Sequence, residues 1–385
     1  MVVEAKTSQD YTAALEILGY SCRYNDVAKR VEINGQEYDE FIRSEIQVAM
    51  RDAGFKNRQL INDIVLTQAR ADTYNPIKDR FDRLPDWDGT PRIKELAAYL
   101  KPETPDLAAT LLYKWMIGAV SKLYAKTQNM VLVIQGDQGT GKSHFAEWLA
   151  STFDREYFTA DDLDPRDKDY QIRACTTFIW EIGEMDDTTS KKDFGALKRF
   201  LTTKVFKLRL PFGFRDTMLP VICSYIGTVN ETGGFLIDQS GNRRFWVFKS
   251  KGIDFDYVNK FNPDDLWAEA YAAFKHGESF TLTPEEKAAN EREQAAVEVV
   301  DLTAEAMTEI FDIDPDNIDW VMPISKVRDY LSRRTTLTAA ELTSRKLGAA
   351  AARLKLGKVK AKVDGKSCRC YTGLKLTETV YMDFA

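Results

Sequence analysis

One run of residues has the types and spacing of a phosphate-binding loop. The pattern G-x-x-x-x-G-K-[ST] is met at residues 136–143, which are Gly136, Asp137, Gln138, Gly139, Thr140, Gly141, Lys142 and Ser143. Glycines permit backbone conformations in which amide groups converge on phosphate oxygens. Lys142 is placed to reach the β- and γ-phosphates of a nucleotide, and the Ser143 hydroxyl to bind Mg²⁺. The predicted ligands are therefore ATP and Mg²⁺.

The flanking sequence favours this interpretation over a chance match in a surface loop. Residues 130–135 are a nearly continuous apolar run, typical of a strand buried on both faces of a parallel sheet. Residues 143–150 have helical character, so the N-terminus of a helix would face the phosphates. We therefore expect His144, in the first turn of that helix, to belong to the nucleotide site as well.

Further candidates for catalysis stand at the ends of later apolar runs. Glu181 is predicted to bind Mg²⁺ and Glu184 to activate water, although Glu184 could also be a solvated loop acid. Asn230 suits a polar sensor of the γ-phosphate or of the attacking water. Arg243 and Arg244 enter a strand and suit a charge clamp on a neighbour's nucleotide, the alternative being a salt bridge within the chain.

Basic and aromatic residues alternate with apolar ones in a predicted hairpin at residues 204–217. Such residues on a protruding tip suit stacking and phosphate contacts with single-stranded nucleic acid. The alternative is a solvated basic hairpin packed on its neighbours. The candidate DNA-binding residues here are Lys207, Arg209, Phe212, Phe214 and Arg215.

A second basic hairpin is predicted near the C-terminus, where residues 358–363 and 366–371 flank an Asp-Gly turn. With two predicted helices before it, this unit is typical of a winged helix. Alternation puts small residues such as Val359 and Cys370 on a packed face. The open face then carries Lys358, Lys360, Lys362, Arg369 and Tyr371. DNA would relieve the repulsion between opposed basic residues; a solvated face or a docking surface for an acidic protein are the alternatives.

Composition and charge set the wider expectations. The 385 residues suffice for two to three domains, and the net charge of −6 hides a strong asymmetry. Residues 281–320 hold 12 acidic and 2 basic residues, and residues 341–375 hold 10 basic and 2 acidic ones. No signal peptide and no apolar run long enough to span a bilayer is found. The five cysteines include no C-x-x-C pair, which favours a reduced, cytoplasmic setting without structural zinc.

The predicted fold class is α/β, with a phosphate-loop ATPase core between two smaller domains. A long helix at residues 107–124 could line the adenine pocket, but packing of Trp115 in the core is as good an explanation. We expect a small α+β domain for oligomerisation or packing at 1–74, a helical lead-in at 75–125, the ATPase core at 126–280, an acidic, partly helical linker at 281–320 and a winged-helix-like domain at 321–385.

The ordered set of motifs resembles the virulence-associated protein E family of phages and mobile elements, which is grouped with the D5-like, superfamily 3 helicases of the AAA+ class. The resemblance runs from about residue 74 to 286, over half of the chain. Besides the phosphate loop, the matching stretches are residues 75–80 (NPIKDR), 87–92 (WDGTPR), 114–119 (KWMIGA), 180–184 (WEIGE), 227–230 (GTVN), 241–246 (GNRRFW) and 266–270 (LWAEA).

The resemblance implies a hexameric ring that hydrolyses ATP at subunit interfaces and moves along single-stranded DNA during replication of a phage or mobile element in a bacterial cytoplasm. It also implies that Arg244, rather than Arg243, is the arginine finger. Primase activity is expected either to come from a separate primase or polymerase partner or to be absent. Two other functions stay open: an AAA+ ATPase that remodels or loads replication proteins, and a DNA-binding initiator or regulator whose assembly is controlled by nucleotide.

Overall fold

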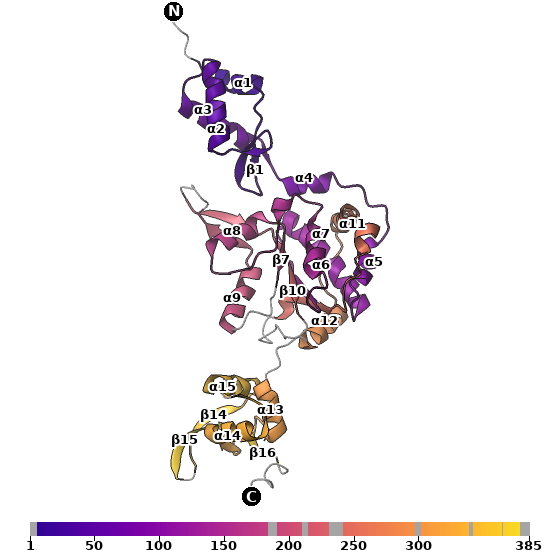
Figure 1. Ribbon diagram of the computed structural model, residues 1–385, viewed down its shortest axis with the longest axis vertical. Helices are drawn as coiled ribbons and strands as arrows, with labels where there is room; N and C mark the ends of the chain where they lie inside the picture. Colours follow the sequence, from indigo (N-terminus) through magenta and orange to yellow (C-terminus); the bar gives the residue numbers. More distant parts are fainter. Residues whose placement is uncertain are drawn as a thin grey trace, which may run out of the picture. The chain divides into compact units, whose positions relative to one another are not determined.

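The computed structural model describes residues 6–183, 191–209, 215–230, 242–296, 302–338, 342–363 and 365–377 (Figure 1). The chain divides into two compact units, Met1–Glu298 and Val299–Ala385. Each unit contains a hydrophobic core of its own. None of the described helices is long and apolar enough to cross a membrane.

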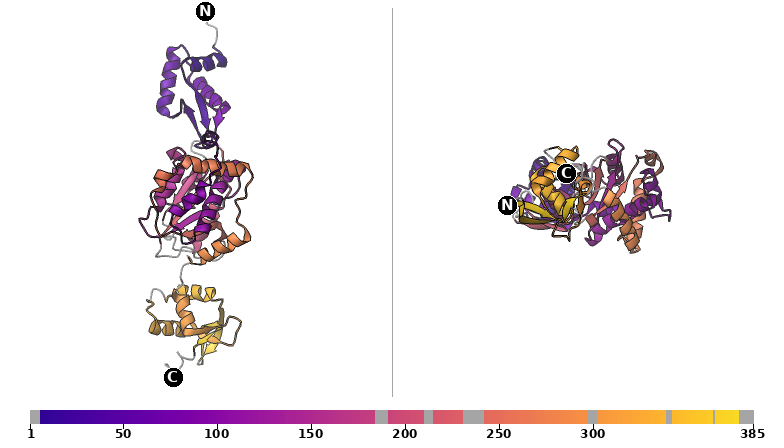
Figure 2. Two further views of the ribbon diagram at one scale, coloured as in Figure 1. Left: turned by 90° about the vertical axis from the view of Figure 1, so that its right-hand side faces the viewer. Right: turned by 90° about the horizontal axis from the view of Figure 1, so that it is seen from below.

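The first elements of the larger unit form a small subdomain of their own, coloured indigo in Figure 2. A sheet with strand order β3-β2-β1-β4 packs with three helices around a separate apolar cluster. Asn34 and Gly35, both at positive φ, form the tight turn between β2 and β3. The elements are α1 Ser8–Ile17, β1 Cys22–Asn25, β2 Arg30–Ile33, β3 Gln36–Glu37, α2 Glu40–Asp52, α3 Arg58–Ala71 and β4 Thr73–Tyr74.

The central part of this unit alternates helices and strands. Its leading helices are α4 Pro76–Asp82, α5 Arg92–Tyr99 and α6 Pro105–Ala125. The sheet and its first crossovers follow as β5 Val131–Gln135, α7 Lys142–Ala150, β6 Phe158–Thr159, α8 Lys168–Thr176, β7 Ile179–Ile182 and α9 Lys191–Leu201. The remaining elements are β8 Val205–Leu208, β9 Thr217–Pro220, β10 Ser224–Val229, the 3-10 turn η3 Asn242–Arg244, β11 Phe245–Lys249, α10 Tyr257–Lys260, α11 Pro263–Lys275 and α12 Pro284–Ala296.

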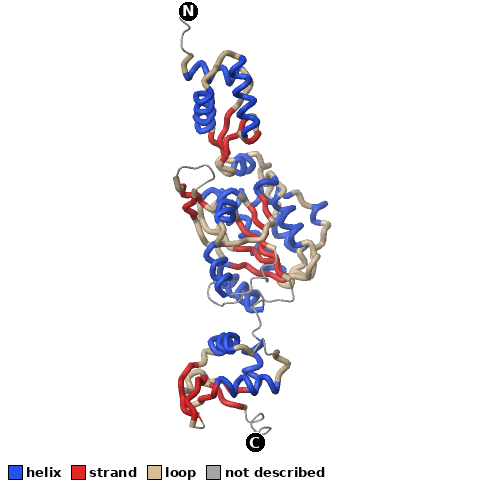
Figure 3. Tube along the Cα trace, turned by 60° about the vertical axis from the view of Figure 1, so that its left-hand side comes forward, coloured by secondary structure: helices blue, strands red, loops and turns tan. Residues whose placement is uncertain are grey.

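Five parallel strands form the central sheet, in the order β11-β5-β10-β7-β6. Successive side chains of a strand point to opposite faces, so both faces can be apolar. Leu132 and Ile134 pack in one cluster with the helices α5, α6 and α11, whereas Val131 and Val133 pack in a second cluster with α8, α9 and the hairpin β8–β9. Figure 3 shows the strands, in red, running between blue helices. This confirms the buried parallel strand predicted at residues 130–135.

Three polar contacts fasten the helices that carry motifs of the family resemblance. Arg80 donates from Nε to the carbonyl oxygen of Thr152 at 2.8 Å and pairs with Asp264. Glu269, on α11, accepts a hydrogen bond of 2.9 Å from the backbone N–H of Ile93, in the first turn of α5. Motifs that are far apart in the sequence therefore meet where these helices pack.

The acidic segment 281–320 does not act as a linker along its length. Its first part, α12, belongs to the larger unit, because Asn290 and Gln294 hydrogen-bond to backbone groups of Phe245 and Val247 at β11. Its later part supplies α13 (Leu302–Ile310) and β12 (Phe311–Ile313) to the core of the second unit. The acidic residues gave the segment the composition of a linker, but buried amides and apolar positions between them make these packed elements.

In its described residues, the second unit packs three helices against short strands. A three-stranded sheet has the order β13-β15-β14, and β12 pairs with β16. Its elements are α13 Leu302–Ile310, β12 Phe311–Ile313, β13 Val321–Pro323, α14 Ile324–Arg334, α15 Ser344–Arg353, β14 Gly357–Val363, β15 Lys366–Thr372 and β16 Leu374–Leu376.

The hairpin β14–β15 has the predicted register, but side chains of both faces are buried at its base: Cys370 on the face predicted to pack and Tyr371 on the face predicted to be open. Every predicted pair is observed, from Val363 opposite Lys366 to Lys358 opposite Tyr371. Tyr371, however, is 1% exposed and lies in the core, while Val359 is 41% exposed. The prediction that Tyr371 stands on the open face is therefore wrong. Burying a large aromatic ring against the helices removes more apolar surface from water than burying valine.

Candidate functional site

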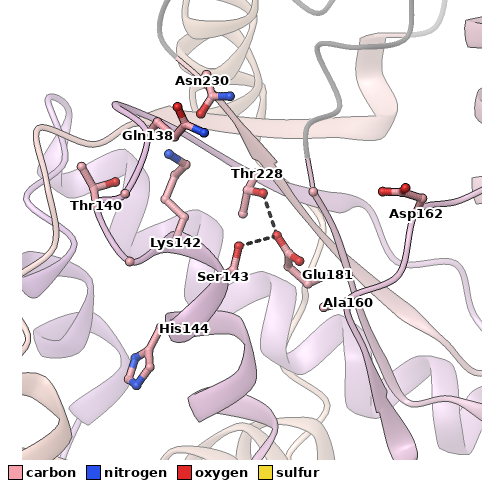
Figure 4. A pocket seen from close by; sticks show the side chains of 13 residues that line it. Gln138, Thr140, Lys142, Ser143, His144, Ala160, Asp162, Glu181, Thr228 and Asn230 are labelled. Carbon is pink, nitrogen blue, oxygen red and sulfur yellow. Dashed lines mark hydrogen bonds between the residues drawn. The ribbon is translucent and has the colours of Figure 1, made fainter.

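A pocket of about 550 Å³ lies where the loop between β5 and α7 meets the ends of β7 and β10 (Figure 4). The carboxyl ends of parallel strands are where open α/β sheets place their ligands. The loop and the first turn of α7 contribute most of the lining, and β7, β10 and the segment after β6 supply the rest. The lining residues are Gln138, Gly139, Thr140, Gly141, Lys142, Ser143, His144, Ala160, Asp162, Glu181, Gly183, Thr228 and Asn230.

The three loop glycines are required for different reasons. Gly139 and Gly141 have φ of 76° and 92°, the left-handed region that other residues rarely adopt. A Cβ atom on Gly141 would also lie 2.4 Å from Cζ of Phe255. Gly136 has no such φ, but a Cβ there would lie 2.5 Å from the carbonyl oxygen of Ser250. The loop is therefore held in a shape that larger side chains would not permit.

Lys142 begins α7 and is buried in the concave side of the loop. Its Nζ donates to the carbonyl oxygens of Gly136 and Asp137, at 2.7 and 2.6 Å. Neutral carbonyls are weaker partners for an ammonium group than phosphate oxygens are. The positive end of the α7 dipole adds to the attraction for an anion. The loop therefore combines a fixed cation with backbone amides, as phosphate binding requires.

Glu181 links the loop to two strands of the sheet. Its side chain is almost fully buried, and Oε1 accepts hydrogen bonds from Oγ of Ser143 at 3.0 Å and from Oγ1 of Thr228 at 2.6 Å (Figure 4). A serine hydroxyl beside a carboxylate is an oxygen donor set that suits Mg²⁺. These residues fit the predicted metal site, although its occupancy by Mg²⁺ stays a prediction.

Two polar lining residues were not found from the sequence. Thr228 lies inside an apolar strand, and only the pairing of β10 with β7 brings its hydroxyl to Glu181. Asp162 follows β6 in a segment that is rich in acidic residues, a signal present in the sequence but too general to indicate a site. Asn230 lines the pocket as expected, and its role as a sensor stays a prediction. Glu184 lies outside the described residues.

The two arginines stand apart from this pocket. Arg243 and Arg244 belong to the turn η3 that enters β11, where Arg243 is exposed and Arg244 is partly buried. Among the residues that the structure describes, neither is part of the pocket lining. This placement agrees with a function toward another subunit but does not test it.

Aromatic residues around the loop occupy two different environments. Trp115 of α6 is fully buried, and its Nε1 donates to the carbonyl oxygen of Tyr225 at 3.2 Å, so it is a core residue and cannot contact adenine. His144 is exposed in the first turn of α7, with Nδ1 2.8 Å from the hydroxyl of Tyr257. Burial raises the pKa of Tyr257, so its hydroxyl keeps its proton.

The first basic hairpin is formed by β8 and β9, which pair in antiparallel register. Phe206 and Leu208 pack toward the core, whereas Lys207 and Arg209 are exposed, and so is Arg215. Phe212 and Phe214 lie outside the described residues. The alternation predicted for the strand is therefore confirmed, and contact with DNA stays a prediction.

The second basic hairpin carries Lys358, Lys360 and Lys362 on one face of β14; we call these three residues the wing lysines. All three are exposed, as is Arg369 on β15. The ammonium group of Lys358 lies 5.9 Å from the centre of the Tyr371 ring. Because Tyr371 packs among the helices, the wing lysines share the face of the hairpin that these helices cover at its base.

Fold and pocket together define a mixed α/β protein with a five-stranded parallel sheet and a glycine-rich loop at its carboxyl edge. The chain belongs to the virulence-associated protein E-like domain family, whose profile matches residues 81–299. No curated protein matches it. Two similar solved structures are titled as apo structures of the NrS-1 C terminal region. They are 16% and 14% identical, with TM-scores of 0.52 and 0.51, and each comparison covers 96% of this chain and 100% of the other. These likenesses concern the fold.

Proposed function

We propose that this protein is an ATP-driven DNA helicase or translocase of phage or mobile-element replication, with a phosphate-loop core of the AAA+ superfamily 3 type. The observation that carries the proposal is the contact between Ser143, at the end of the glycine loop, and Glu181 on a separate strand. A phosphate cradle alone would serve any phosphate ligand. A buried carboxylate beside the loop serine adds the donor set for a metal-bound triphosphate.

The residues of the pocket have separate tasks in this proposal. Backbone amides of the loop and Lys142 bind and orient the β- and γ-phosphates. Ser143 and Glu181 would hold Mg²⁺, which when bound neutralises charge on the phosphate oxygens. Thr228 fixes the carboxylate of Glu181 in place, and Asn230 orients the attacking water. Glu184 is retained as the residue that activates this water.

The proposed assembly is a hexameric ring in which Arg244 reaches the γ-phosphate of a neighbouring subunit. In support of this, Arg244 is not among the described residues that line the pocket of its own chain. An arginine there would stabilise the charge that develops as the phosphoryl group is transferred. The N-terminal subdomain at residues 1–74 is the proposed oligomerisation or packing domain.

DNA contact is proposed for both basic hairpins. Lys207, Arg209 and Arg215 offer charge for the backbone of a single strand, with Phe212 and Phe214 proposed to stack on its bases. The second unit is proposed to be a winged-helix-like domain whose wing lysines and Arg369 bind phosphates. A primase or polymerase would then be a separate partner, and the bacterial cytoplasm the place of action.

The direct test is ATP hydrolysis with and without single-stranded DNA, together with unwinding of a forked duplex. We expect hydrolysis that DNA stimulates and that Lys142→Ala and Glu181→Gln reduce by orders of magnitude. Lys207→Ala combined with Arg215→Ala should lower unwinding and DNA stimulation but leave basal hydrolysis intact. Hydrolysis at the wild-type rate by Lys142→Ala would refute the nucleotide site.

One rival function has an observation in its favour. The basic hairpin β14–β15 sits in a unit with its own core, as expected of a DNA-binding initiator or regulator whose nucleotide controls assembly. DNA binding that depends on nucleotide, without unwinding of any substrate, would favour this rival. An AAA+ ATPase that remodels or loads replication proteins would hydrolyse ATP but likewise fail to unwind DNA.

A further inference from the structure

An exposed aromatic side chain lies against the glycine loop at Gly141. Phe255 follows β11 and is 49% exposed, although its ring edge lies against Gly141. Val258, one helical turn later, is 41% exposed. Single exposed apolar residues are common, but Phe255 lies directly beside the loop predicted to bind a triphosphate.

The ring of Phe255 is supported from behind by a rigid set of residues. Tyr257 is fully buried, with its ring 6.3 Å from that of Phe255 and nearly parallel to it. Trp148 packs edge-on against Tyr257 at 4.6 Å, and the hydroxyl of Tyr257 bonds to His144. The backbone N–H of Asp254 is held by the carbonyl oxygen of Tyr99 at 2.8 Å. The exposed face is therefore held in place before any ligand arrives.

The direction of the His144 side chain indicates that the nucleoside, rather than the phosphates, would lie beside Phe255. His144 follows Ser143 directly, and its side chain points away from Glu181 and Thr228 (Figure 4). The terminal phosphates belong near Glu181, where the metal would be held. A triphosphate lying along the loop then directs its nucleoside toward the other flank, where the rings of His144 and Phe255 lie 5.5 Å apart.

We propose that Phe255, supported by Tyr257 and flanked by His144, is the stacking surface for the nucleobase of the bound nucleotide. The inference rests on the proposed function, because it requires a triphosphate in the loop. It adds a residue that contacts the base rather than the phosphates. Stacking on an aromatic ring accepts any base and favours the larger purines. Trp115, the aromatic residue considered from the sequence, is excluded by its burial.

The test compares two ligands that share the phosphates but not the base. Binding of a non-hydrolysable ATP analogue and of inorganic tripolyphosphate, each with Mg²⁺, is measured by calorimetry on the full chain. We expect Phe255→Ala to weaken binding of the analogue on the order of 10-fold, the effect of losing one stacked base. Binding of tripolyphosphate should not change, and Phe255→Trp should retain binding of both ligands.

A matched control and a reference variant separate the possible outcomes. Phe41→Ala removes a phenylalanine that is 75% exposed on α2 and should alter neither affinity. Unchanged binding of the analogue to Phe255→Ala would overturn the assignment, as would an equal loss for both ligands, because the ring would then only support the loop. Lys142→Ala should lose both ligands. If it bound both normally, the proposed function would fail, whatever Phe255 does.

Discussion

Glu269 makes the stability of the larger unit dependent on pH. This side chain of α11 is 1% exposed, and its carboxylate accepts a backbone hydrogen bond at the start of α5. Burial raises its pKa from 4.5 to about 7, an effect that the hydrogen bonds from Ile93 and Arg92 only partly oppose. The perturbation is Glu269→Gln, which keeps an oxygen acceptor for Ile93 but cannot ionise.

The change in the free energy of unfolding with pH follows from the number of protons that the folded and unfolded states bind. Between pH 4.5 and 7 the folded protein keeps a proton on Glu269 that the unfolded chain has lost, so the free energy of unfolding decreases as pH rises. Above pH 7 the raised pKa lowers the free energy of unfolding by about 3.4 kcal/mol in total. Of this loss, about 0.8 kcal/mol is already present at pH 5. From pH 5 to pH 8, Glu269→Gln should therefore gain about 2.5 kcal/mol relative to the wild type.

Urea unfolding followed by tryptophan fluorescence, at pH 5 and at pH 8, measures this gain. Glu16→Gln, at an exposed position of α1, is the matched control and should leave the difference between the two pH values as in the wild type. An equal effect of Glu269→Gln at both pH values would contradict the raised pKa of Glu269. In that case the carboxylate would be ionised in the folded protein at both pH values, stabilised by the N-terminus of α5.

Three further predictions concern the proposed activity. Thr228→Val removes a hydrogen bond to a buried carboxylate, worth about 1.5–3 kcal/mol, and should lower ATP hydrolysis at limiting Mg²⁺ by roughly 10- to 100-fold; Thr228→Ser should retain most of it, and equal loss in both variants would contradict the role of the hydroxyl. Mixing inactive Lys142→Ala with inactive Arg244→Ala subunits should restore part of the hydrolysis, since some interfaces then pair an intact loop with an intact arginine; no recovery in rings shown to be mixed would place Arg244 in the site of its own chain. Alanine at all three wing lysines should reduce the salt slope of single-stranded DNA binding by up to about 2, and an unchanged slope would favour an acidic protein partner.

Local patterns in the sequence predicted the elements whose structure is set locally. The loop at residues 136–143 has both its preceding strand and its following helix where they were expected, because β5 is apolar on both faces and α7 begins at the lysine that the motif requires. The register of β14 and β15 was correct along its length because a two-residue turn leaves one pairing.

Features that depend on packing between distant segments were not predictable in this way. The burial of Tyr371 at the base of β14–β15 depended on the helices that receive its ring, not on the alternation itself. Thr228 and Phe255 are functional candidates only because they contact Glu181 and Gly141, which lie far from them in the sequence. An apolar strand and a turn give no local sign of such contacts.

Strand β10 relates the two sites that the proposed function requires. Its carboxyl end presents Thr228 to the pocket, and its amino end follows directly from the hairpin β8–β9. Lys122 is fully buried and donates to the carbonyl oxygen of Cys223, while the N–H of Val221 bonds to the carbonyl oxygen of Lys204 at the other root of the hairpin. A strand buried along its whole length transmits displacement rather than absorbing it. Under the proposed function, rearrangement around Glu181 on hydrolysis would therefore move the hairpin that holds the DNA.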